Sequence, residues 1–132
     1  MPTITFVNNI NSARPARPSI SAALMEVKNQ VEYHCFADLR TKWVDPFYGE
    51  LCLVIAEVFV MDPCGAVKIN GNTVNMYQVQ EVFRLLRNDH LRVVCGRFQN
   101  LSFRVYNKKA YLRTALYNVF FEIESHFVSF EH

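Results

Sequence analysis

The fold is decided by residues 67–118, which read VKINGNTVNMYQVQEVFRLLRNDHLRVVCGRFQNLSFRVYNKKAYLRTALYN. Asn70 and Gly71 stand between two short β-branched runs, and both residue types tolerate the positive φ that a two-residue hairpin turn requires. The pattern predicts a small β-hairpin at residues 67–74. Helical patterns follow it, so the hairpin marks the point at which the chain changes from strand to helix.

An asparagine stands at the start of each helix expected after the hairpin. Asn75 suits the N-cap of the first, and Gln78 three residues later completes a capping-box pattern. Asn88 starts the second helix, and Asn107 caps the last one, which is rich in aromatic residues. Apolar residues recur at helical spacing in all three. These inward positions are Val79, Val82, Phe83, Leu86, Leu91, Val94, Cys95, Phe98, Leu112, Leu116, Val119, Phe120, Ile123 and Phe127.

Two further helices are expected in the first half of the chain. Residues 21–30 suit a short helix, and Asp45-Pro46 is a typical start for another, with Asp as the cap and Pro at the first helical position. This second helix is apolar on more than one face, which predicts that it is the buried central helix. Residues 31–42 carry both strand-like and helical spacing, and both readings stay open. The sequence thus predicts a mainly α fold, with about five helices and one β-hairpin.

The chain is expected to form one folded domain behind a leader. A length of 132 residues suits a single domain, here residues 21–132. Residues 1–20 are predicted to be a flexible leader, because Pro15 and Pro18 prevent a regular helix. The alternative is a basic arm, since an arginine precedes each of these prolines.

The sequence predicts a cytoplasmic protein without catalysis. No apolar run is long enough to cross a membrane, and no export signal opens the chain. The cysteines form no C-x-x-C pair, no Cys/His spacing suggests zinc, and no nucleotide-binding or hydrolase motif is present. We therefore expect reduced thiols, no metal, no cofactor and no membrane partner. His90 is expected to help start a helix.

Charge is unevenly distributed along the chain. Residues 67–113 carry nine lysines and arginines against two acids, a net charge of +7, whereas residues 1–66 are net −2 and residues 114–132 net −3. A compact positive segment in an otherwise acidic chain makes a polyanion the first candidate partner. The alternative is a solvated polar face.

The candidate site residues are the cations of this segment and one tyrosine. Lys108 and Lys109 fall in the first turn of the last helix, where the helix dipole disfavours cations, so a phosphate site is expected there. Tyr106 is a candidate for stacking on unpaired bases, whereas Tyr111 and Tyr117 are expected in the core. The residues expected to bind nucleic acid or a protein partner are Arg84, Arg87, Arg92, Arg97, Arg104, Lys108, Lys109, Arg113 and Tyr106.

A self-association surface is expected near the C-terminus. Phe121, Phe127 and Phe130 exceed what a core of this size is expected to bury. The prediction is a homodimer formed through these aromatic side chains.

The stretch from the hairpin to the last helix also resembles a known family. Its motifs are an extended segment with an I-x-G turn, a helical L-x-x-x-H-[ILV] pattern, and a final N-K-K-A-Y-L…A-L-Y-N run. The matching positions are Val67, Ile69, Gly71, Leu86, His90, Leu91, Asn107, Lys108, Lys109, Ala110, Tyr111, Leu112, Ala115, Leu116, Tyr117 and Asn118. Together they resemble the C-terminal, DnaD-like domain of the replication initiator protein A family of plasmids and conjugative elements.

This resemblance implies a helical accessory domain that contacts replication proteins or DNA. Initiators of that family carry a winged-helix DNA-binding domain before it, and the short segment ahead of the match here leaves no room for one, so origin recognition is not carried over. The expected function is a non-enzymatic binding module of a mobile genetic element, contacting nucleic acid or a nucleic-acid-processing protein through a basic face. The alternative is a stand-alone inhibitor of host machinery, such as an anti-CRISPR protein that binds a CRISPR effector nuclease.

Overall fold

The computed structural model describes residues 18–33, 46–101 and 104–131, except for the side chains of Pro46 and of residues 126–131. Its elements run in the order α2 (Ile20–Gln30), α3 (Pro46–Phe59), β1 (Ala66–Ile69), β2 (Asn72–Asn75), α4 (Met76–Arg84), α5 (Asn88–Gln99) and α6 (Lys108–Glu131). The prediction of a mainly α fold with one small hairpin is confirmed. The leader before Pro18 and most of residues 31–42, with Cys35 and His34, lie outside the described residues.

Helix α3 forms the centre of the domain, as the sequence predicts. Its fully or almost fully buried side chains occur on several faces, and they are Tyr48, Leu51, Cys52, Val54, Ile55, Ala56 and Val58. Helix α2 packs along α3, with Ala23, Val27 and Val31 buried between them. Because apolar surface removed from water stabilises the fold in proportion to its area, these buried side chains of α3 contribute to the stability of the fold.

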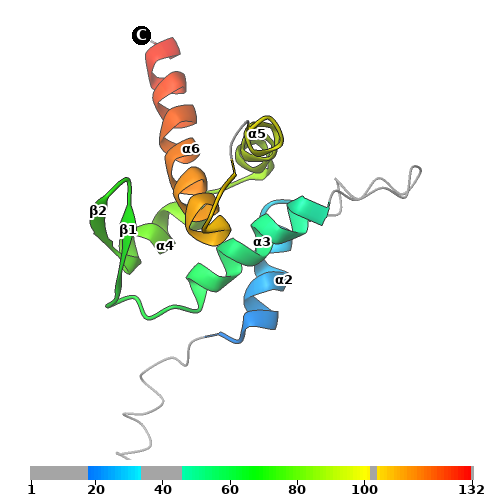
Figure 1. Cartoon of the computed structure of the whole chain (residues 1–132), viewed down its shortest axis with the longest axis vertical. Coiled ribbons are helices and arrows are strands. Elements are labelled where there is room, and N and C mark those ends of the chain that lie inside the picture. The colour runs from blue at the N-terminus through cyan, green and yellow to red at the C-terminus, as the bar shows by residue number, and fades with distance from the viewer. Residues whose placement is uncertain (1–17, 34–45, 102–103, 132) are drawn as a thin grey trace, which may run out of the picture.

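Helix α6 crosses α3 and joins the remaining elements. It contacts α5, α3, α4 and β1, and Figure 1 shows the hairpin and α5 on opposite sides of it. Its buried side chains are Leu112, Leu116, Tyr117 and Val119. Beyond this buried section α6 continues away from the other helices, so its C-terminal part stands clear of the domain (Figure 1).

The hairpin forms where the sequence predicts it. Val67 pairs with Val74 across an antiparallel ladder, and the turn residues Asn70 and Gly71 have φ values of 56° and 80°. Two successive positive φ angles are those of the hairpin turn that Asn-Gly favours. The side-chain amides of Asn70 and Asn118 then donate to each other, with N···O distances of 2.8 and 3.0 Å, so the turn is bonded to the middle of α6.

Two glutamine side chains donate hydrogen bonds to the last carbonyl groups of neighbouring helices, which the sequence does not predict. Buried Gln80 of α4 donates its amide to the carbonyls of Val58 and Met61 at the end of α3, at 3.0 and 2.9 Å. Gln30 of α2 does the same for the carbonyls of Phe83 and Leu86 at the end of α4, at 2.8 Å each. The last carbonyls of a helix lack partners within it, so these long-range bonds satisfy groups that would otherwise be buried unpaired.

Candidate functional site

The first turn of α6 lies on the exposed face of α3. Asn107 caps the turn as predicted, because its side-chain oxygen accepts from the backbone N–H of Ala110 at 3.1 Å. Lys108 Nζ lies 2.7 Å from a carboxylate oxygen of Glu50, and Lys109 Nζ lies 2.8 Å from one of Glu57. Both lysines that sequence reading proposes as a phosphate site are therefore paired with carboxylates from the first half of the chain.

The spacing of the two carboxylates explains why neighbouring lysines reach them separately. Glu50 and Glu57 are seven residues apart on α3, two helical turns or about 10 Å along one face. Lys108 and Lys109 are neighbours on α6, and each reaches a different one of these two carboxylates. The carboxylates also offset the unfavourable position of two cations beside the positive end of the α6 dipole.

An open cavity of about 310 Å³ lies between the two ion pairs. We call it the α3–α6 groove, and its lining residues are Glu50, Leu53, Val54, Glu57, Lys108, Lys109 and Leu112. Val54 and Leu112 are buried, whereas Leu53 is 38% exposed. The groove therefore has an apolar floor and a charged rim of both signs.

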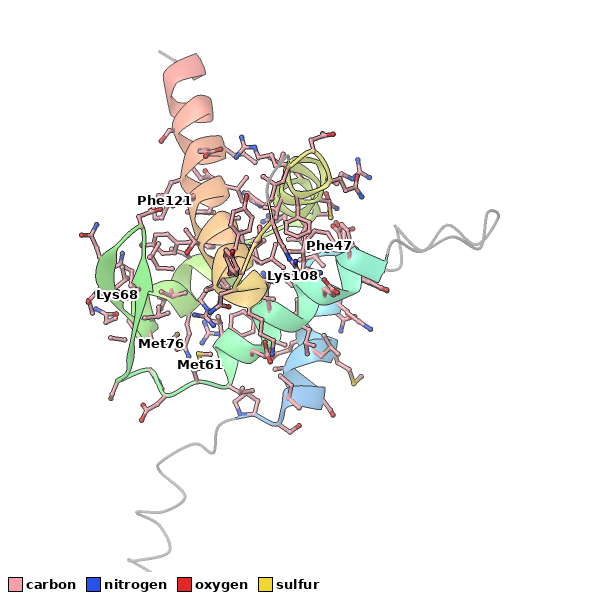
Figure 2. The ribbon with its side chains drawn as sticks, in the orientation of Figure 1. Phe47, Met61, Lys68, Met76, Lys108 and Phe121 are labelled. Carbon is pink, nitrogen blue, oxygen red and sulfur yellow. The ribbon has the colours of Figure 1, made fainter. Side chains whose placement is uncertain are left out.

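A cluster of aromatic rings adjoins one end of this groove. Phe47 of α3 and Phe98 of α5 stack with their centroids 4.6 Å apart, and Tyr111 of α6 is tilted against Phe98 at 6.0 Å. Lys108 Nζ lies 5.3 Å from the centroids of both phenylalanines. Figure 2 shows Lys108 and Phe47 together where α6 crosses α3. Lys108 thus contacts two aromatic rings as well as a carboxylate.

The other predicted cations do not gather around this groove. Arg97 pairs with Glu122 of α6 at 2.7 Å, beside a separate α5–α6 cavity of about 200 Å³. Arg84 lies 5.2 Å from the centroid of Phe59, which is the last residue of α3. Lys108 contacts Phe47 near the first residue of α3, and twelve residues of helix span about 18 Å. The predicted basic residues are therefore spread over different parts of the domain.

The four remaining exposed candidates, like Arg84, Arg97, Lys108 and Lys109, have side chains that water reaches. Arg87 precedes α5, Arg92 lies on it, Arg104 lies between α5 and α6, and Tyr106 is 98% exposed. Arg113 differs from them, because it is half-buried and its Nε has no hydrogen-bond partner among the described residues. As predicted, Tyr117 is buried, and its hydroxyl accepts from the Gln78 side-chain amide at 2.6 Å.

His90 starts α5, as the sequence predicts, instead of lining a site. Its Nδ1 accepts from the backbone N–H of Arg87 at 2.9 Å, and its ring lies 5.7 Å from that of Phe120. Burial lowers the pKa of His90 below its ordinary value, although the nearby carboxylates of Asp89 and Glu124 oppose that shift. The neutral imidazole is therefore the form that the fold favours.

The described residues bring no cluster of metal-binding side chains together, and the buried Cys52 thiol is not activated. Nowhere in the described ranges do three His, Cys, Asp or Glu side chains lie together as a metal ion would require. Burial raises the pKa of the Cys52 thiol to about 11, so that thiol is protonated near neutral pH and is a poor nucleophile. Within the same residues, no helix has the length and apolar character needed to cross a membrane.

Comparisons with protein-family models, with curated proteins and with solved structures found no match for this chain. The resemblance to the replication initiator family therefore stays a prediction that depends on the motifs quoted above. Two of those motifs do meet in space, because Asn70 of the hairpin turn binds Asn118 at the end of the last motif.

Sequence reading missed the acidic side of the groove. The sequence pattern places Glu50, Leu53 and Glu57 in a central helix, where they recur at i, i+3 and i+7 on one face. The sequence feature that could have revealed this face is the presence of two acidic residues, Glu50 and Glu57, on the same side of an otherwise apolar helix. Two acidic residues on one side of a helix predict that this side of α3 is exposed to solvent.

Proposed function

We propose that this chain is a non-enzymatic protein-binding module and that it holds an amphipathic helix of its partner in the α3–α6 groove. The observation that carries the proposal is the exposed Leu53 between the Lys108–Glu50 and Lys109–Glu57 ion pairs. An apolar centre inside a polar, solvent-accessible rim is the usual anatomy of a protein interface. A helix that lays one apolar face into such a groove is a recurring mode of recognition.

The charges of the groove favour a protein over nucleic acid. Binding of nucleic acid depends on cations that neutralise phosphates and release counterions. Here each lysine already has a carboxylate neighbour, and the two glutamates would repel a phosphate backbone. A helix with acidic and basic residues on either side of an aliphatic one complements the rim instead.

The resemblance to initiators suggests the class of partner. We propose a nucleic-acid-processing protein, with a replication protein as the first candidate. The alternative partner is a CRISPR effector nuclease, in which case the chain acts as an anti-CRISPR inhibitor. Both candidates are proteins, so the same groove serves either of them.

Photo-crosslinking from the groove tests this proposal. A photoreactive amino acid replaces Leu53 in one variant and Met25 in a matched control, because Met25 is 69% exposed on α2, outside the groove. We expect position 53 to crosslink one protein in cells that carry the chain, and position 25 to give no such product. The purified partner should then lose at least tenfold in affinity for Leu53→Glu but not for Met25→Glu.

Binding to DNA in place of a protein is the outcome that would contradict this proposal. Gel shifts with single- and double-stranded DNA at two salt concentrations would reveal a phosphate-dependent interaction. Salt-sensitive binding that Leu53→Glu leaves intact, together with equal crosslinking from positions 53 and 25, would contradict the proposal. The exposed Arg87, Arg92 and Arg104 would then be the residues to replace next.

A further inference from the structure

We propose that Phe47, Phe98 and Glu50 form a receptor for an arginine side chain of the partner, and that Lys108 occupies this receptor in the free chain. The identity of the arginine as a partner residue rests on the proposed function, whereas the receptor itself is a property of this chain. The observation is the convergence of one ammonium on two aromatic rings and a carboxylate. Lys108 Nζ lies 5.3 Å from both ring centroids and 2.7 Å from Glu50.

These three groups are the ones that proteins use to bind organic cations. The faces of aromatic rings carry partial negative charge and attract a cation within about 6 Å of the ring centre. A carboxylate beside them supplies the opposite full charge and accepts hydrogen bonds from the cation. The rings come from two different helices, and Phe98 is further supported by Tyr111, so the receptor is held by packing around it.

Lys108 can leave this receptor at little cost. Its side chain is 46% exposed and that of Glu50 is 49% exposed, and an ion pair so accessible to water contributes little to stability. A lysine on a flexible stem also regains conformational freedom when it is released. Replacement of one cation by another keeps the charge balance, so the exchange depends mainly on which cation fits better.

An arginine fits better than the lysine it would replace. Its planar guanidinium can lie against a ring face while two of its N–H groups bind one carboxylate, whereas an ammonium is a compact point charge. Glu50 and Lys108 also line the α3–α6 groove, so the receptor opens directly beside Leu53. A partner helix with an arginine one turn from its aliphatic anchor would therefore reach both places.

The test uses butylguanidinium as the probe and needs no partner. Lys108→Ala empties the receptor, and the ring resonances of Phe47 and Phe98 are followed by NMR as the probe is added. We expect saturable shifts in Lys108→Ala, with an affinity roughly threefold higher than in the wild type, because the exposed Lys108 competes only weakly for the receptor. Lys109→Ala is the matched control, because it removes the neighbouring ion pair and leaves Lys108 in place, so it should behave as the wild type does.

Two further measurements keep the outcome unambiguous. Adding Glu50→Gln to Lys108→Ala should lower the probe affinity at least fivefold, because the carboxylate is lost. Lys108→Gln serves in place of Lys108→Ala if thermal unfolding shows that the alanine variant does not fold. Equal weak binding by wild type, Lys108→Ala and Lys109→Ala would overturn the receptor, whereas failure of the crosslinking at position 53 would overturn the groove and leave this result unaffected.

Discussion

Helix α6 meets the rest of the domain in two contrasting ways. Its middle packs buried Leu116 and Val119 and bonds Asn118 to the hairpin through neutral amides. Its first turn contacts α3 through ion pairs that water reaches, around an open cavity. The middle of α6 therefore stabilises the fold, whereas its first turn leaves polar and apolar groups exposed to water.

The largest effect on stability is expected in the middle of α6. Leu116 is completely buried, so Leu116→Ala should lower the free energy of unfolding by roughly 2–5 kcal/mol through lost burial and a cavity. Urea unfolding measures the change. Leu53→Ala removes the same atoms from a side chain that is 38% exposed, and it should cost much less. Equal losses in the two variants would contradict the contrast between the two parts of the interface.

The stabilising part of this interface could be predicted from local sequence. The Asn70-Gly71 turn, the Asn107 cap and the spacing of Leu112, Leu116 and Val119 each depend on neighbours a few residues away. Propensity and periodicity act over that range, so the hairpin and the helices follow from them.

The groove could not be predicted in the same way. Lys108 and Glu50 are far apart in the chain, and nothing in the local pattern says which acid meets which lysine. The charge count of residues 67–113 leaves out Glu50 and Glu57, the α3 acids that pair with two of its cations. A segment's net charge therefore described its sequence and not the surface that it forms.

A pH-dependent effect of intermediate size is expected at the start of α5. Because burial lowers the pKa of His90, its imidazole is neutral in the folded state and contributes fully above the unfolded pKa of about 6.5. As the pH falls below that value, the unfolded chain takes up the proton first, so stability falls until the pH passes the lower folded pKa. His90→Gln keeps an acceptor for the Arg87 N–H without a titrating group.

Urea unfolding of both proteins between pH 7.5 and 5, a window set around the ordinary histidine pKa, isolates this contribution. The wild type should lose stability relative to His90→Gln as the pH decreases, because all other titrating groups are common to the two proteins. Parallel curves would show that His90 does not couple its protonation to folding.

The smallest effect is expected for the ion pair at the far end of the groove from Phe47. Lys109 is 62% exposed and Glu57 is 30% exposed, so a double-mutant cycle with Lys109→Met and Glu57→Gln should give a coupling below about 1 kcal/mol. The coupling should decrease further when salt is added, because water and ions reach the pair. A salt-independent coupling above about 2 kcal/mol would mean that this pair holds α6 onto α3. The first turn would then belong to the stabilising part of the interface, and a partner could not separate its lysines from α3 without unfolding the contact.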